Sequence, residues 1–145
     1  MIFCSKPQKF TWRNAITLLL LLTAGSILIL LLIPSGSWFG SETDWYSQHV
    51  TIADYMRKNF YATGILFPDF TGLGGGTNFF SLSYYGFMRP DVLISYLFPH
   101  VEMEWFIQGY AIFEILLGGG LLYYWLHQKG FSDFTGFVCG FFYLC

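Results

Sequence analysis

The sequence predicts an all-α polytopic membrane protein with a long external loop between its first two membrane helices. The chain of 145 residues is 54% hydrophobic and 11% charged, and its mean hydropathy is +0.50, which is too apolar for a soluble domain of this size. Two apolar runs are each long enough to cross a hydrocarbon core about 30 Å thick as a helix. The segment between them far exceeds the usual helix connection of roughly 2–8 residues. A net charge of −2 without a basic stripe argues against nucleic acid as a partner.

Basic residues near the start of the chain set its predicted orientation. Lys6, Lys9 and Arg13 precede the first apolar run, so the positive-inside rule places residues 1–14 in the cytoplasm as a tail. Residues 15–33 carry no charge and are predicted to form the first transmembrane helix. The chain that follows emerges on the outer side of the membrane.

The second transmembrane helix is predicted over residues 105–126, and it returns the chain to the cytoplasm. Trp105 lies at its outer edge, and Tyr123, Tyr124 and Trp125 are expected to form an aromatic belt at the other interface. Residues 127–133 form a short cytoplasmic turn. Residues 134–145 are apolar but too few to span a bilayer, so they are predicted to be the start of a third helix in a longer protein.

Residues 34–104 form the predicted external loop. The loop is rich in Trp, Tyr, Phe and Leu, which disordered segments lack, and seven acidic residues outnumber its three bases, as expected outside a membrane. The acids are Glu42, Asp44, Asp54, Asp69, Asp91, Glu102 and Glu104, and the bases are Arg57, Lys58 and Arg89.

Two interfacial helices are predicted inside the loop. Over residues 44–62, apolar or aromatic side chains recur at helical spacing, and Gly64 can end the helix. Over residues 90–98, Pro90 occupies the first helical position, Asp91 lies in the first turn and Pro99 follows the end.

Two carboxylates mark the start of the loop. Glu42 and Asp44 lie two residues apart, and on an extended or turned backbone both would converge on one cation or sugar phosphate, where either can act as a general base. The alternative is that both simply favour the positive end of a helix dipole. Gln48 lies one turn after Asp44 and His49 follows it, so this polar edge could face a bound headgroup. For His49, burial in the apolar stripe of its helix is the competing interpretation.

Residues 72–78 form a glycine-rich segment that is predicted to be non-helical. Glycine allows positive φ and close approach, so backbone N–H groups near Gly75, Gly76 and Asn78 could bind a phosphate. Tyr84 and Tyr85, in the aromatic patch that follows, are further candidates for substrate binding. The alternative is a tight turn between two surface helices.

Arg89 is the predicted partner of an anionic phosphate. It stands next to Pro90 at a helix start, where the helix dipole does not favour a cation. For Arg57 and Lys58 we expect a solvated helix end, with Asp54 paired to Lys58 at i, i+4.

Glu114 lies within the second predicted span. It is about nine residues in, which at 1.5 Å per residue is roughly 14 Å deep, near the midplane. An ionisable residue at that depth is a functional candidate. The alternative is a protonated or hydrogen-bonded side chain packed between helices, since Gly118, Gly119 and Gly120 on the same helix indicate close helix contacts.

Five motifs follow one another across the loop: DWYSQH, DYMRKNFYATG, GLGGGTN, SYYGFMRP and LISYLFP. In this order, and placed between two membrane helices, they resemble the YfhO family of bacterial membrane proteins. The resemblance covers about residues 40–100 and both flanking spans. It implies a GT-C type glycosyltransferase fold, in which a polytopic enzyme takes a sugar from a polyprenyl-phosphate carrier at the outer face of the membrane.

The resemblance also implies roles for particular residues and partners. Asp44, supported by Glu42, would be the catalytic or metal-associated acid of the first external loop. Members of the GT-C group differ in their need for a divalent cation, so Mg²⁺ or Mn²⁺ is left open as a cofactor. The donor would be a polyprenyl-phosphate-linked sugar in the cell membrane, and the acceptor a teichoic acid, lipoteichoic acid in particular. The segment alone is expected to be inactive.

Two other functions remain open from the sequence. One is a transporter or flippase component, in which the loop helices gate a path and Glu114 couples transport to protons. The other is a non-catalytic membrane scaffold.

Overall fold

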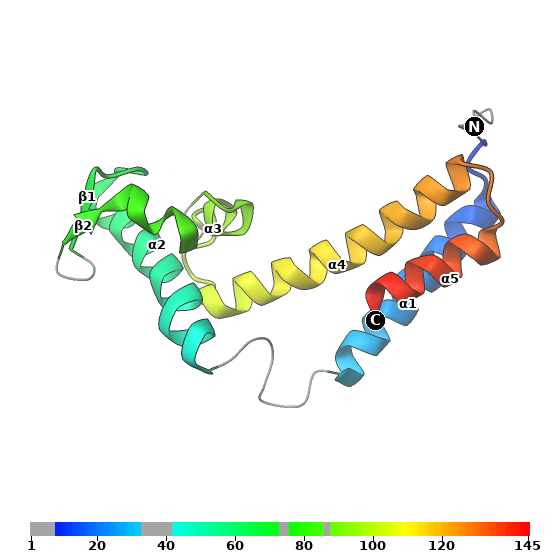
Figure 1. The fold of residues 1–145 in the computed structure, drawn as a ribbon, viewed down its shortest axis with the longest axis horizontal. Coiled ribbons are helices and arrows are strands. Elements are labelled where there is room, and N and C mark those ends of the chain that lie inside the picture. Colours follow the sequence, from blue (N-terminus) through cyan, green and yellow to red (C-terminus); the bar gives the residue numbers. More distant parts are fainter. Residues whose placement is uncertain (1–7, 33–41, 73–75, 86–87) are drawn as a thin grey trace. The chain divides into compact units, whose positions relative to one another are not determined.

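The structure is a computed structural model that describes residues 8–32, 42–72, 76–85 and 88–145. These residues contain five α-helices, a π-helix, a 3₁₀-helix and two strands of two residues each, so the described chain is all-α apart from one short hairpin. The chain forms two compact units, one of residues 1–37 and 111–145 and the other of residues 38–110 (Figure 1). We call them the three-helix unit and the loop unit.

The three-helix unit consists of α1 (Trp12–Leu32), the larger part of α4 (Met103–Gln128) and α5 (Asp133–Leu144). By length and composition, α1 and α4 can each cross a membrane, and α5 is a shorter apolar helix. Ser132 caps α5 by accepting a hydrogen bond from the Thr135 backbone N–H at 3.1 Å. Residues 134–145, which were predicted to start a third helix, are helical up to Leu144.

Glycines allow the helices of this unit to pack closely. A Cβ atom added to Gly140 would lie 3.1 Å from the carbonyl oxygen of Gly119 and 2.7 Å from Cδ2 of Leu21. A Cβ atom added to Gly25 would lie 2.4 Å from Cδ1 of Leu144. The predicted close helix contacts near Gly119 are confirmed, and small residues are what such contacts require.

The core of the three-helix unit contains one residue that we had expected at the membrane interface. Leu21, Tyr123 and Leu144 are buried together, and Leu18, Leu116 and Phe141 are among the residues packed against them. The Tyr123 side chain is 0% exposed, so it does not belong to the expected aromatic belt, whereas Tyr124 and Trp125 are exposed and their place at a membrane interface stays a prediction. Tyr123 is tolerated inside because its hydroxyl group finds polar partners.

The loop unit begins with two helices joined end to end. The π-helix η1 (Glu42–Val50) runs directly into α2 (Thr51–Thr63), over the region where a single helix was predicted. Gly64 ends α2 as predicted, with φ at 72° and its N–H bonded to the Phe60 carbonyl at 2.7 Å. Ile52 and Met56 are buried against Leu82, which confirms the apolar stripe on this helix.

The rest of the loop unit folds back on α2. Strands β1 (Phe70–Thr71) and β2 (Thr77–Asn78) pair antiparallel, and η3 (Phe79–Tyr85) is a 3₁₀-helix. Helix α3 (Pro90–Ser95) has Pro90 at its start as predicted, and it continues to Phe98 as a tighter turn with i to i+3 hydrogen bonds. Val92 on α3 is buried with Ala53, Met103 and Ile107, so α2, α3 and the start of α4 share one core.

Arg57 corrects another expectation. We predicted a solvated helix end, but Arg57 is 6% exposed and donates to the Val101 carbonyl at 2.8 Å and the Phe98 carbonyl at 3.4 Å. Asp54 lies 3.3 Å from the same guanidinium group. Arg57 therefore ties α2 to the segment before α4. Lys58 is exposed and pairs with Asp54 at 2.6 Å, as predicted.

Candidate functional site

Asp44 lies near the start of η1 and its side chain is exposed. The backbone is helical from Glu42 to Val50, whereas the convergence of Glu42 and Asp44 required an extended or turned backbone. Residues two apart in a helix do not face each other, so the spacing alone gives no shared carboxylate pair. The Glu42 side chain lies outside the described residues. Of the two acids, Asp44 is therefore the one whose side chain the structure describes.

A π-helix is an unusual setting for three candidate residues. Asp44, Gln48 and His49 all lie on η1, and Gln48 and His49 are half-buried. π-Helical turns are rare, because their i to i+5 hydrogen bonds are less stable than those of an α-helix. Those that occur are often found at functional sites. The local fold is thus compatible with a site on η1.

His49 lies between aromatic rings. Its ring centroid is 6.4 Å from that of Trp45 and 6.4 Å from that of Tyr85. Tyr85 in turn packs against the buried cluster of Ile52, Met56 and Leu82. The fold therefore brings together two predicted substrate-binding residues, His49 and Tyr85, and it supports partial burial of His49 in the apolar stripe.

The glycine-rich segment begins after β1, and its last two residues, Thr77 and Asn78, form β2. Gly76 has φ at 100°, a conformation that favours glycine, and Gly75 lies outside the described residues. The Asn78 side chain accepts a hydrogen bond from the Phe80 N–H at 2.8 Å and so starts η3. Tyr84 is part of η3, but its side chain is outside the described part of the chain. The described residues of this segment are non-helical, as predicted, and the choice between a phosphate-binding loop and a tight turn falls on residues 73–75, which lie outside the described residues.

Arg89 already has an anionic partner within the chain. It precedes α3 and its guanidinium group donates two hydrogen bonds to Asp91, one from Nε to Oδ1 at 3.0 Å and one from Nη2 to Oδ2. Asp91 is 1% exposed, whereas the Arg89 side chain is partly open to solvent. The ion pair explains why a cation stands at a helix start. A guanidinium group has five N–H donors, so three of them are not used by Asp91.

A second polar region of the loop unit was not predicted. A pocket of about 410 Å³ is lined by Asp54, Arg57, Lys58, His100, Glu102 and Glu104, among others. Glu104 accepts hydrogen bonds from the Tyr46 hydroxyl at 2.6 Å and from Gln108 Nε2 at 3.2 Å. The candidate residues on η1 and Arg89 do not belong to this lining as the described residues define it.

The aromatic residues beside this pocket hold α2 against α3. The rings of Phe60 and Tyr96 stack with centroids 5.0 Å apart, and the Tyr61 hydroxyl donates to the Tyr96 carbonyl. Burial raises the pKa of the Tyr96 phenol, so it stays neutral at physiological pH.

Within the described residues, no three His, Cys, Asp or Glu side chains lie close enough to share a metal ion. A divalent cation near Asp44 would need ligands from its substrate, from water or from residues beyond those described.

Glu114 is exposed on α4 in the three-helix unit. Phe113, Leu117 and Leu121 are exposed on the same helix, so Glu114 lies on a mainly apolar surface. The alternative interpretation, a Glu114 side chain packed between the helices of this unit, is not what the structure shows.

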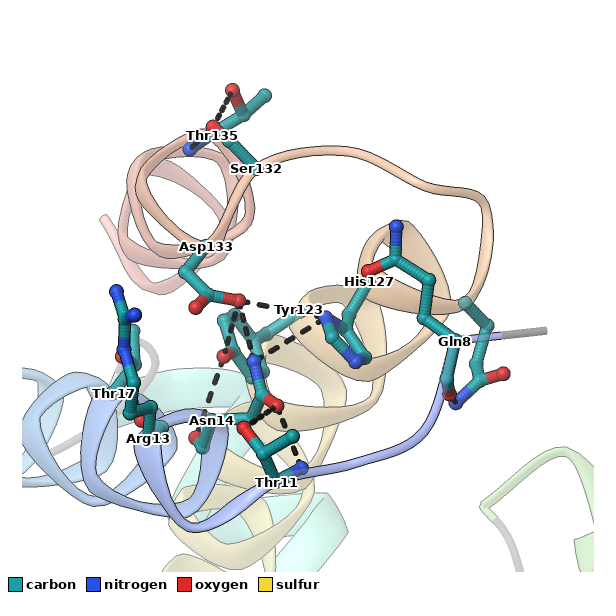
Figure 2. A network of polar contacts seen from close by, with 11 residues as sticks. Gln8, Thr11, Arg13, Asn14, Thr17, Tyr123, His127, Ser132, Asp133 and Thr135 are labelled. Carbon is teal, nitrogen blue, oxygen red and sulfur yellow. Dashed lines mark hydrogen bonds and ion pairs between the residues drawn. The ribbon is translucent and has the colours of Figure 1, made fainter. Parts of the chain in front are cut away.

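The three-helix unit contains a buried polar network that sequence reasoning missed (Figure 2). Asn14 of α1 is 3% exposed, and its Nδ2 donates to Asp133 Oδ1 at 2.6 Å and lies 3.4 Å from His127 Nδ1. The Tyr123 hydroxyl lies 3.3 Å from both the Asn14 carbonyl and Asp133 Oδ1. Figure 2 shows these four side chains pointing toward one another from α1, α4 and the start of α5.

Weak signals of this network are present in the sequence. Asn14 directly precedes the first apolar run, and His127 and Asp133 flank the short turn between two apolar helices. Polar residues at helix ends are normally solvated, so only the packing of three helix ends reveals that Asn14 and His127 are buried and that Asp133 is half-buried beside them.

No protein-family description, curated protein or solved structure matches the chain. The assignment of function depends on the residues described above.

Proposed function

We propose that the chain is part of a multi-pass cell-membrane glycosyltransferase of the GT-C type. It transfers a sugar from a polyprenyl-phosphate donor to an envelope acceptor such as lipoteichoic acid, at the outer face of the membrane. The N-terminus is cytoplasmic, α1 and α4 cross the bilayer, and the loop unit faces outward. The observation that carries the proposal is an exposed Asp44 on a π-helix at the start of a folded, aromatic-rich loop.

Three further features support this function. α1 and α4 are long and apolar enough to span a membrane, which suits an enzyme whose donor is a lipid. The loop unit has its own buried clusters, so its surface residues are held in fixed positions. The order of motifs from Asp44 to Pro99 resembles that of the YfhO family.

Asp44 acts as the base in the proposed reaction. The acceptor hydroxyl attacks the anomeric carbon of the sugar, its proton passes to the Asp44 carboxylate, and the bond to the polyprenyl-phosphate oxygen breaks. Arg89 stabilises the phosphate with the donors that Asp91 leaves free. Glu42 is the alternative acid, and Gln48, His49 and Tyr85 contact the sugar or the phosphate.

The test replaces Asp44 with Asn in the full-length protein. Asp44→Asn keeps the size of the side chain and removes its basicity, so we expect sugar transfer to fall by roughly 10²–10⁴-fold while expression stays normal. The measurement is acceptor glycosylation in cells that lack the native gene and are complemented with each variant.

Glu114→Gln is the matched comparison, because it also replaces one exposed carboxylate with an amide. The glycosyltransferase account expects it to retain transfer. If Asp44→Asn is fully active and Glu114→Gln is not, the transporter or flippase function is favoured. Glu114 lies on an exposed apolar face of α4, and an ionisable residue in such a place is the one on which proton coupling would depend.

A further inference from the structure

A second candidate site lies in the three-helix unit. A pocket of about 570 Å³ is lined by the segment that leads into α1, by His127 at the end of α4 and by the turn that leads into α5. Its lining includes Lys9, Arg13, His127 and Asp133. The pocket shares no residue with the proposed catalytic site.

The pocket carries an excess of positive charge. Within the described residues, no ion pair within 4.0 Å joins Lys9 or Arg13 to a carboxylate, and the ion pair seen near the pocket is that of His127 with Asp133. The first turn of α1 contains no acidic residue, so the positive end of its dipole adds to the charge of Arg13. Cations at that end do not stabilise the helix, so helix stability does not account for Arg13.

Asp133 is not paired with either of these cations within the described residues. Its Oδ1 already accepts a hydrogen bond from Asn14 at 2.6 Å and lies 3.4 Å from His127 Nδ1 and 3.3 Å from the Tyr123 hydroxyl. The carboxylate is thus held by the buried network of Figure 2. Asp133 is the acid that the described lining contains, so the two cations outnumber it.

The wall of the pocket is rigid and has unused hydrogen-bonding capacity. His127 is 5% exposed, and its Nε2 is buried with no hydrogen-bond partner within the described residues. Such atoms are uncommon in folded proteins, and an ordered water or ion is one usual explanation for them. The turn beside it is fixed by Gly130, with φ at 88°, and by the Ser132 cap of α5.

Exposed aromatic side chains lie next to the cations. Trp12 is 78% exposed and Phe131 is 49% exposed, and both belong to the lining. Aromatic rings beside Lys and Arg are typical of a membrane interface, where the rings lie among headgroups. If α1 and α4 cross the membrane with the N-terminus inside, the pocket lies at the inner interface.

We propose that this pocket binds a phosphate group, and that the phosphate is carried by an anionic phospholipid of the inner leaflet. Lys9 and Arg13 pair with the phosphate, Trp12 and Phe131 contact the upper acyl chains, and the network of Asn14, His127 and Asp133 holds the three helix ends in place. Basic pockets between membrane helices on the cytoplasmic side bind such headgroups in other proteins. The proposal rests on the membrane placement of α1 and α4 and is independent of sugar transfer.

The experiment measures lipid association directly. The full-length protein is reconstituted in phosphatidylcholine vesicles that contain a small fraction of spin-labelled phosphatidylglycerol, and the immobilised fraction of the label gives a relative association constant. We expect Lys9→Gln and Arg13→Gln each to lower this constant about fivefold, the effect of one cation near a charged lipid.

Lys129→Gln is the matched control. Lys129 is an exposed cation that follows the end of α4 in the same unit, its ammonium group lies 5.8 Å from the Trp125 ring centroid, and it does not belong to the pocket lining. We expect Lys129→Gln to change the constant by less than about twofold, since it leaves the pocket cations in place. Equal losses in all three variants would show a general attraction to the charged surface and overturn the proposal, and so would no loss in any of them.

A further arm distinguishes lipid from soluble phosphate. Inorganic phosphate in excess is compared with chloride at the same ionic strength. We expect the two salts to weaken lipid association equally, because screening depends on ionic strength. A larger loss in phosphate would assign the pocket to a soluble anion and contradict the lipid assignment. Unchanged heat stability of each variant confirms that the fold is retained.

Discussion

Arg89 shows how one residue can serve both the fold and a proposed site. The sequence places it at a helix start, where a cation is unexpected, and the structure pairs it with the buried Asp91. Removal of Arg89 alone therefore changes two things, the phosphate partner and the charge balance of a buried carboxylate. An unpaired buried polar group costs about 1–3 kcal/mol, and more when it is charged.

A paired substitution separates these two effects. In Arg89→Gln combined with Asp91→Asn, both charges disappear and no buried charge is left alone, so we expect normal expression and heat stability. Donor binding should still weaken, with KM for the polyprenyl-phosphate sugar raised about tenfold and kcat changed less, because a phosphate contact is lost. Asp91→Asn alone leaves Arg89 free and should keep KM at or below its normal value. A normal KM in the paired variant would remove Arg89 from the donor site.

At the level of secondary-structure elements, the sequence predicted where helices end better than which of their side chains are buried. The ends set by Gly64 and Pro90 were correct, because a left-handed C-cap and a proline at the first helical position are local effects. The π-helical form of η1 and the burial of Tyr123 and Arg57 were not predicted. These features depend on contacts with residues distant in the chain, such as Asn14 for Tyr123 and Val101 for Arg57.

Gly140 on α5 gives a test of the helix packing. Gly140→Ala places a Cβ atom 3.1 Å from the Gly119 carbonyl oxygen, and backbone cannot easily move away. We expect a loss of about 1–3 kcal/mol, typical of overpacking, seen as a lower midpoint when the full-length protein is heated in detergent. Gly109→Ala on α4 is the control, since nothing lies within 4 Å of its added Cβ. Gly109→Ala should leave the midpoint unchanged or raise it, because alanine favours helix. If both variants behave alike, α5 does not pack on α4 through this glycine.

At the scale of the whole molecule, composition and hydrophobic runs predicted two long apolar helices and a folded segment between them, and both are present. The candidate site was predicted only as a set of residues. His49 and Tyr85 meet in the structure, whereas the Asn78 side chain has the local role of starting η3. Spacing along a chain indicates which residues share a helix face, whereas contacts between η1, η3 and α3 depend on how the loop unit packs.

The proposed full-length protein cleaves a lipid-linked sugar at the outer face of the membrane. Right-side-out vesicles with the protein are supplied with a polyprenyl-phosphate sugar labelled in the sugar, and both the label and the lipid are followed. The account predicts that the label moves to an external acceptor while polyprenyl phosphate is released in equal amount, and that vesicles with Asp44→Asn do neither. Movement of the intact labelled lipid across the membrane, without release of polyprenyl phosphate, would contradict it.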